Sequence, residues 1–285
     1  MTRGRILILL TILVAGTLPI PIRALADLGW SAIESAAVRC LIGSLVVGLV
    51  HWRKLAQIKH SPGIVLALGL ATVIAMGGYM YALQHIPAGL AAALMFVGPI
   101  WVVLWETIQG NTMRREHIAC ALGFLGTVLI IGTASLQGNV AWSGLAAGLM
   151  ASLGFALFFM ASDRASKEIS PECLAFWSWG LAAPAFAWTL PDAHWSMEVI
   201  PWVAFIGLVN GALYVLLLFA AVRTIANPSE SSIWQYGELV VVSLVGLFLW
   251  QEIPTLLGAG GALLILVAGI LLATSRSAEQ TSATT

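Results

Sequence analysis

The chain has 285 residues, of which 60% are hydrophobic and 9% charged, and its mean hydropathy is +0.95. Because so few polar side chains cannot cover a water-soluble globule of this size, the composition excludes a soluble protein and indicates an all-α integral membrane protein. The formal net charge is +0, and this neutral balance argues against a polybasic surface for nucleic acid.

Ten apolar segments follow one another along the chain. A helix that spans a bilayer needs about 20 apolar residues, and breaks with charges, Pro or Asn/Gly clusters separate runs of this length. The first run follows Arg3 and Arg5, as in a signal peptide, but its length and the sequence Thr17-Leu18-Pro19-Ile20-Pro21 favour a retained helix. Transmembrane helices are predicted at approximately 5–23, 30–51, 63–85, 88–109, 117–136, 141–161, 171–191, 198–222, 228–250 and 255–274.

The basic residues predict how these helices cross the membrane, because Lys and Arg near helix ends resist translocation. With a cytoplasmic N-terminus, all 13 basic residues except Arg23 and Arg39 fall on the cytoplasmic side. Arg23 then lies outside, near the end of the first helix, and Arg39 lies within the second. The sequence therefore predicts a protein of the cell inner membrane with both termini in the cytoplasm.

The ten predicted helices divide into two halves of five, residues 1–137 and 138–285. An odd number per half forces the second half to insert with the opposite orientation. Internal similarity supports the duplication, since Ala82–Ile86 aligns with Ala221–Ile225 and neighbouring matches keep a nearly constant offset. Two inverted five-helix repeats place a substrate site near the membrane midplane, where rocking of the halves gives alternating access.

Several motifs resemble a known family. They are Tyr81-Ala82-Leu83, Ile86-Pro87-Ala88-Gly89, Phe96-Val97-Gly98-Pro99, and Trp250-Gln251-Glu252 before a Gly-rich last helix. The chain resembles the EamA group of the drug/metabolite transporter superfamily over essentially its whole length, which implies an inner-membrane exporter of amino acids or related small metabolites. Its membrane Trp and Tyr content is similar to that of aromatic amino-acid exporters of the group. The Ile86–Pro99 stretch also resembles threonine/homoserine exporters.

Arg39 is the most informative polar residue in the predicted membrane segments. Ser31 and Glu34 form a capping-box pattern that starts the second helix. Eight residues beyond Ser31, at a helical rise of about 1.5 Å each, place Arg39 about 12 Å into the bilayer. A charge at that depth needs a partner or a wet cavity. Arg39 is thus either a structural link to a neighbouring helix or a ligand for a substrate carboxylate.

Glu238 offers the opposite charge on the ninth helix. Asn227 and Pro228 predict where this helix starts, and ten further residues place Glu238 about 15 Å deep, near the midplane. Glu238 can then pair with Arg39, bind a substrate amine, or titrate and couple export to protons. Trp234 and Gln235 precede it by about one turn and would present an aromatic ring and an amide beside the carboxylate.

Aromatic residues complete the predicted site. On the fourth helix Trp101 shares a face with Leu94 and Gly98, and Pro99 predicts a kink beside that face. A cavity between the fourth helix and its repeat partner, the ninth, would also have tyrosines from the third and eighth helices as walls, although plain helix packing explains each aromatic equally well. The predicted substrate-binding residues are Arg39, Tyr79, Trp101, Tyr214, Trp234, Gln235 and Glu238.

Other classes of function lack a sequence pattern. Cys40, Cys120 and Cys173 show no metal-ligand spacing, and the Gly258–Gly261 run lacks the strand and turn of a nucleotide loop, so neither a metal nor a cofactor is expected. An intramembrane enzyme would need a His motif or paired carboxylates within the bilayer, and the sequence has neither pattern. A channel would need a continuous polar stripe, whereas a non-transporting receptor or assembly protein stays open as an alternative. The expected partners are a small-molecule substrate, the lipid bilayer and, for coupled export, protons.

Overall fold

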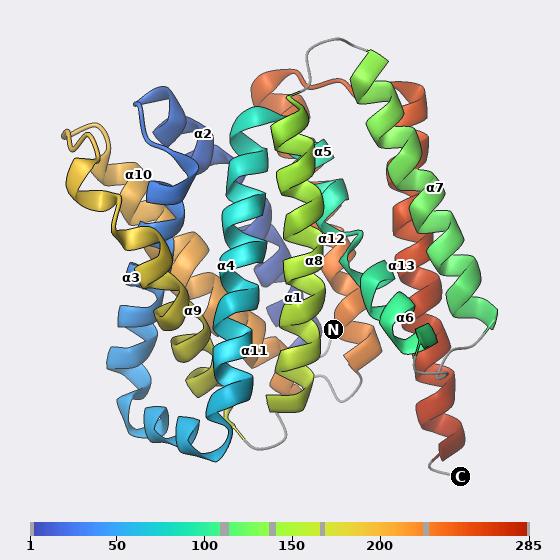
Figure 1. The fold of residues 1–285 in the computed structure, drawn as a ribbon, viewed down its shortest axis with the longest axis horizontal. Coiled ribbons are helices and arrows are strands. Elements are labelled where there is room, and N and C mark those ends of the chain that lie inside the picture. Colours follow the sequence, from blue (N-terminus) through green and yellow to red (C-terminus); the bar gives the residue numbers. More distant parts are fainter. Residues whose placement is uncertain (1–2, 109–113, 137–140, 166–168, 225–227, 284–285) are drawn as a thin grey trace.

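The computed structural model describes residues 3–108, 114–136, 141–165, 169–224 and 228–283 (Figure 1). Within these ranges the chain forms helices and no strand, which confirms the all-α prediction. The α-helices are α1 (Arg3–Gly16), α2 (Pro19–Asp27), α3 (Ala32–His51), α4 (Pro62–His85), α5 (Ala88–Met95), α6 (Gly98–Ile108), α7 (Arg114–Leu136), α8 (Trp142–Ala165), α9 (Pro171–Ala187), α10 (Ile200–Ala204), α11 (Tyr214–Thr224), α12 (Pro228–Trp250) and α13 (Leu256–Ala283).

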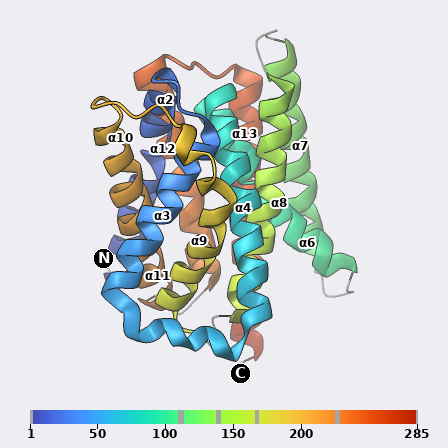
Figure 2. The ribbon, with the colours of Figure 1, turned by 60° about the vertical axis from the view of Figure 1, so that its left-hand side comes forward.

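Three further segments have other helical geometries. The 3-10 helix η1 (Trp52–His60) joins α3 to α4 at the end of the bundle where the C-terminus also lies (Figure 2). A short 3-10 turn, η2 (Leu190–Asp192), follows α9, and the π-helix η3 (Phe205–Leu213) connects α10 to α11. Isolated π-turns are rare, and a nine-residue π-helix marks a segment where packing has overridden the ordinary helical ladder.

Five helical segments are long and apolar enough to cross a membrane: Leu9–Asp27, Ala32–Lys59, Pro62–His85, Trp142–Ser162 and Ile200–Leu218. Shorter apolar helices run over His117–Leu129, Gly237–Trp250 and Leu256–Leu271. These segments identify a multi-pass membrane protein, while the count of ten passages and their orientation stay predictions. Exposed apolar side chains such as Phe124 on α7 and Phe248 on α12 form the surface that lipid would cover.

Two predicted spans are interrupted. The first is not a continuous helix over 5–23, because α1 ends at Gly16 and α2 starts at Pro19. The fourth is interrupted at Phe96 and Val97, so the kink expected beside Pro99 is a full break between α5 and α6. Proline has no backbone N–H to continue a helical ladder, which accounts for both positions.

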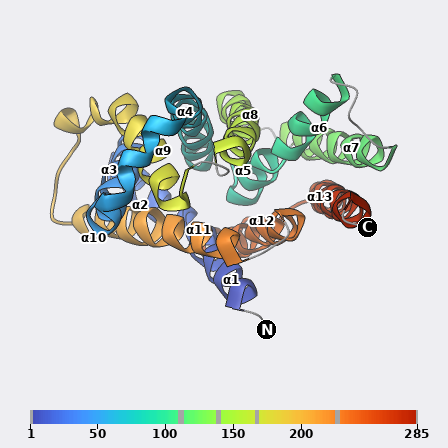
Figure 3. The same ribbon diagram turned by 90° about the horizontal axis from the view of Figure 1, so that it is seen from below.

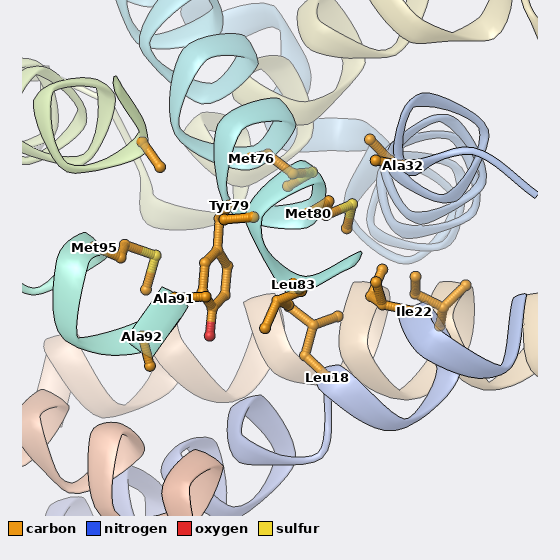
Figure 4. Packing of buried hydrophobic residues seen from close by; sticks show 14 of the residues in the cluster. Leu18, Ile22, Ala32, Met76, Tyr79, Met80, Leu83, Ala91, Ala92 and Met95 are labelled. Atoms are coloured by element: carbon orange, nitrogen blue, oxygen red, sulfur yellow. The ribbon is translucent and has the colours of Figure 1, made fainter. Parts of the chain in front are cut away.

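The helices form two sides of a bundle (Figure 3). Viewed along the helices, α4 packs against α8 on one side, whereas α11 and α12 lie on the other. The main hydrophobic core lies toward the α2 and α5 end, where Leu18, Ile22, Met80 and Leu83 pack together (Figure 4). Leu18 and Tyr79 of this core also line the cavity described below.

Candidate functional site

A cavity of about 90 Å³ is lined by residues from both sides of the bundle, among them α4 and α8 on one side and α11 and α12 on the other. Its polar lining consists of Arg39 from α3, Thr72 and Tyr79 from α4, Tyr214 from α11 and Glu238 from α12. A buried water needs roughly 10–15 Å³ of such space, so several waters or the polar head of a small ligand fit. Mostly apolar walls with a few convergent polar groups are typical of small-molecule sites. The other walls are formed by Ala15, Leu18, Ala75, Met76, Met95, Phe155, Phe158, Trp179, Val215 and Leu218.

Arg39 reaches this cavity because its helix starts where the sequence predicted. The Ser31 side chain accepts a hydrogen bond from the Glu34 backbone, and the Glu34 carboxylate binds the Ser31 backbone in return, so the capping box is present. Arg39 is 6% exposed, and its Nε donates to the backbone carbonyl of Asn210 at 2.9 Å. The helix start fixes the depth of Arg39, and the Asn210 carbonyl fixes one edge of its guanidinium.

The guanidinium of Arg39 lies beside two aromatic rings. Its carbon atom lies 5.2 Å from the centroid of the Trp179 ring and 5.4 Å from that of Tyr214. The two rings are 6.4 Å apart with planes 20° from parallel, and both contribute cation–π attraction. Within the described residues, the Nη1 and Nη2 atoms of Arg39 have no hydrogen-bond or ion-pair partner. Arg39 therefore presents a free pair of donors to the cavity.

Glu238 belongs to the same lining and lies on α12. It makes no ion pair with Arg39 within 4.0 Å, and no described residue forms a hydrogen bond with its carboxylate. The direct contact pair considered from the sequence is therefore not formed. A buried charge is unfavourable unless a counter-charge or hydrogen bonds compensate it. A lining that contains both the Arg39 guanidinium and the Glu238 carboxylate is complementary to a molecule that carries both charges.

Tyr79 adds an unsatisfied hydroxyl. It is 3% exposed, and its OH has no hydrogen-bond partner among the described residues. Figure 4 shows the ring extending from α4 toward Ala91 and Ala92 of α5, with Met95 nearby. Leaving a buried hydroxyl without a partner costs about 1–3 kcal/mol. A polar ligand in the cavity would supply that partner.

The other aromatic predictions have different outcomes. Trp101 is not part of the cavity lining: it is 37% exposed, and its Nε1 donates to Ser152 Oγ at 2.8 Å, between α6 and α8. The face it was expected to share with Leu94 requires a continuous helix, which the break before α6 removes. The side chains of Trp234 and Gln235 lie outside the described part of the structure, so their role stays a prediction.

Sequence reasoning missed Trp179 and Asn210. Trp179 lies deep within α9 and is 4% exposed, but nothing in the spacing of α9 residues pairs it with an arginine on α3. Asn210 is fully buried in η3. It was detectable in principle, because an amide in the middle of an apolar span needs hydrogen-bond partners.

Polar contacts close the α2 and α5 end of the bundle. Arg23 forms an ion pair with Glu252, and its Nε and Nη2 donate to the carbonyls of Leu83 and Ile86 at 3.2 and 3.1 Å. The Arg23 guanidinium also lies 4.2 Å from the centroid of the Trp250 ring. The Glu252 carboxylate accepts from the Ala88 backbone N–H at 2.8 Å. Arg23, which the charge pattern places outside, and Glu252 together link α2, α4, α5 and the end of α12.

A second ion pair lies at the other end. Lys54 of η1 binds Glu172 at the start of α9 at 2.8 Å, and the Gln57 side chain accepts from the Ser170 backbone N–H, also at 2.8 Å. These contacts attach η1 to α9, two elements on the same side of the bundle. They do not join the walls of the cavity.

Interrupted apolar helices around a cavity that is lined by an arginine and a glutamate are typical of a membrane transport protein. The chain belongs to the EamA-like transporter family, whose family model matches residues 2–132 and 142–274. The chain is 26% identical over 275 residues to an uncharacterized transporter of Archaeoglobus fulgidus, covering 96% of this chain and 97% of that protein. A solved crystal structure with 20% identity aligns with a TM-score of 0.62 over 96% of this chain and 98% of its own, which supports the fold.

Threonine/homoserine exporters are also similar to this chain. The protein RhtA of Escherichia coli (strain K12) is 27% identical over 158 residues, which cover 53% of this chain and 52% of RhtA. RhtA of Salmonella typhimurium (strain SL1344) is 28% identical over 198 residues, or 66% of this chain and 64% of that protein. The chain thus spans about half of the first exporter and somewhat less than two thirds of the second.

Proposed function

We propose that the protein exports amino acids or related small zwitterions across the inner membrane, with the Arg39–Glu238 cavity as the substrate site. One observation carries the proposal: a guanidinium edge and a carboxylate without hydrogen-bond partners among the described residues line the same cavity. A zwitterion neutralises both walls at once, whereas an anion or a cation alone leaves one charge unpaired. Similarity to threonine/homoserine exporters supports this substrate class.

In the proposed complex, the two Nη atoms of Arg39 bind the substrate carboxylate, since a guanidinium edge matches a carboxylate bidentately. Glu238 binds the ammonium group, together with Gln235. The substrate side chain then lies against aromatic walls such as Trp179 and Phe155, and Trp234 would extend this surface. Trp101 is not included, because it lies outside the lining.

The chemistry of the walls favours aromatic and other apolar amino acids as cargo. The alternative is threonine or homoserine, for which the hydroxyl groups of Thr72 and Tyr79 would be partners in the same cavity. Only threonine and homoserine carry a side-chain hydroxyl that could form hydrogen bonds with Thr72 and Tyr79. A site that hydrogen-bonds a substrate hydroxyl strongly rejects analogues that lack it.

The proposed transport cycle is alternating access by two inverted halves, residues 1–137 and 138–285, with both termini cytoplasmic. The two separate stretches matched by the family model agree with a duplicated chain. Discontinuous helices are common at the substrate sites of such transporters. The breaks after α1 and after α5 lie beside the cavity, where Leu18 and Met95 are lining residues.

Counterflow in proteoliposomes tests the proposal. Vesicles preloaded with one amino acid would be assayed for uptake of labelled phenylalanine, tryptophan, leucine, threonine or homoserine. Phenylpropanoate and phenylethylamine, which each lack one charge of phenylalanine, serve as competitors and are expected to bind at least tenfold more weakly. If no amino acid moves and none shifts the melting temperature, the proposal fails. Binding without movement would instead favour a receptor.

Arg39→Lys and Glu238→Gln separate the two charges. Arg39→Lys keeps the charge but loses the bidentate edge, so competition by phenylpropanoate should weaken while that by phenylethylamine is retained. Glu238→Gln should have the opposite selectivity. Repeating counterflow under an imposed pH gradient tests coupling, because unchanged pH dependence in Glu238→Gln would exclude Glu238 as the sole proton site.

A further inference from the structure

Asn210 occupies an unusual position in the apolar span. It is fully buried in the π-helix η3, between Gly207 and Gly211. A Cβ atom at Gly211 would lie 3.1 Å from the Arg39 carbonyl oxygen, and one at Gly207 would overlap Ile42. The η3 backbone therefore packs directly against the turn of α3 that carries Arg39.

The Asn210 side chain binds a different element. Its Nδ2 donates to the Val14 carbonyl at 2.7 Å and to Thr17 Oγ1 at 3.1 Å, at the break between α1 and α2. Thr17 Oγ1 itself donates to the Val14 carbonyl at 2.7 Å. Both partners are therefore acceptors for Asn210, so the amide orientation follows from chemistry.

The same residue also holds Arg39, through its backbone carbonyl. Asn210 thus connects the α1 break, where Ala15 and Leu18 line the cavity, to the arginine on the neighbouring wall. Its Oδ1 is buried without a partner among the described residues. An unsatisfied buried amide oxygen is unfavourable, so the cost of Oδ1 offsets part of what the two Nδ2 bonds contribute to stability.

We propose that Asn210 is a positioning residue that turns the free Nη edge of Arg39 into the cavity and couples that orientation to the α1–α2 break. This inference rests on the proposed role of Arg39 as the carboxylate ligand. The Nε bond ties the guanidinium to the Asn210 carbonyl, beside the Trp179 and Tyr214 rings, so Asn210 sets where the acceptor lies. When the bonds to Val14 and Thr17 are lost, η3 and its carbonyl are free to shift, and the Nη edge turns with them.

Asn210→Leu tests the coupling, because it keeps the number and branching of the side-chain heavy atoms and the backbone carbonyl but removes the bonds to α1. We expect the half-saturation concentration for counterflow to rise roughly tenfold or more, with a smaller change in maximal rate. Competition by phenylethylamine, which has no carboxylate, should stay unchanged. In the Arg39→Lys background, Asn210→Leu should add little, since residues that act through one another are non-additive. Additive effects would overturn the inference.

A readout without substrate separates this inference from the proposed function. In protein labelled with 5-fluorotryptophan, the Trp179 resonance, assigned with Trp179→Phe, reports on the guanidinium beside it. Asn210→Leu should shift this resonance, whereas Ser152→Ala, which removes a buried hydrogen bond outside the cavity, should not. An unchanged resonance overturns the inference. A shifted resonance in a protein that moves no amino acid overturns only the proposed function.

Thr17→Val provides the second variant if Asn210→Leu does not insert. It removes one of the two acceptors of Asn210 Nδ2 and leaves Asn210 itself intact. We expect a smaller shift of the Trp179 resonance in the same direction and a smaller rise in half-saturation. No shift in Thr17→Val would contradict the proposed link between the α1 break and Arg39.

Discussion

Glu252→Gln should open the α2 and α5 end of the protein to water. The Glu252 carboxylate holds Arg23 in an ion pair and accepts from the Ala88 backbone N–H at 2.8 Å. An amide keeps the shape and one acceptor oxygen but loses the charge. Because Arg23 in turn holds the carbonyls at the end of α4, the substitution weakens the contacts that join α2, α4, α5 and α12.

The free energy lost in Glu252→Gln can be estimated from the exposure of the Arg23 and Glu252 side chains. Both side chains are 18% exposed, so the ion pair contributes roughly 1 kcal/mol. Replacing a charged by a neutral acceptor at Ala88 costs roughly another 1 kcal/mol. A total of about 2 kcal/mol corresponds to a roughly thirtyfold shift in an equilibrium between closed and open ends, since each 1.36 kcal/mol is a factor of ten.

The assay is thiol labelling of a cavity position from outside intact cells. Ala15→Cys, in a background without the native cysteines, places a thiol in the cavity lining at a site that is 3% exposed. An impermeant maleimide should label it up to about thirtyfold faster in Glu252→Gln. Glu172→Gln breaks the ion pair at the opposite end and serves as the control. Equal labelling rates in Glu252→Gln and its parent would show that the Arg23–Glu252 contacts do not keep this end closed, and acceleration only from the cytoplasmic side would refute the predicted orientation.

Three further predictions concern the site and its packing. Tyr79→Phe removes an unpartnered hydroxyl and should raise the free energy of unfolding without substrate by about 1 kcal/mol, measured by thermal denaturation in detergent; destabilisation would show that the hydroxyl has a partner. Trp101→Phe loses the bond to Ser152 and should cost about 1 kcal/mol in the same assay, with half-saturation for counterflow unchanged. Gly43→Ala places a Cβ 2.6 Å from the Trp179 ring and should destabilise by about 1–3 kcal/mol; full stability and wild-type affinity would contradict the tight α3–α9 packing.

The start of each helix and the constant rise per residue were enough to predict that Arg39 and Glu238 lie at similar depths. The capping box at Ser31 and the proline at 228 set where α3 and α12 begin, and counting residues from there predicted similar depths for Arg39 and Glu238. The structure places both in the lining of one cavity, with Tyr79 and Tyr214. Depth along a helix is local information, so the sequence carries it. Binding of substrate by these residues stays a prediction.

The direction in which a residue faces around its helix is harder to predict from sequence than its depth along the helix. The prediction for Trp101 counted turns from Leu94 through Gly98, and the break between α5 and α6 resets that count. Trp179 was missed for a different reason, because its pairing with Arg39 depends on how α3 packs against α9. The π-helix at 205–213 has no proline to mark it. Contacts between segments distant in sequence decide these features, and one sequence does not show them.

The interruptions themselves explain where the cavity lies. A continuous helix satisfies its own backbone and packs along its whole length, whereas a broken span leaves lining positions at its ends. Leu18 follows the end of α1, Met95 ends α5, and Tyr214 follows the π-helix, and each lines the cavity. The uninterrupted α4 supplies the facing wall with Thr72 and Tyr79. If the α5–α6 break is a moving part of transport, substitutions beside it should change the maximal rate of counterflow, while substitutions on the α4 wall should change substrate affinity.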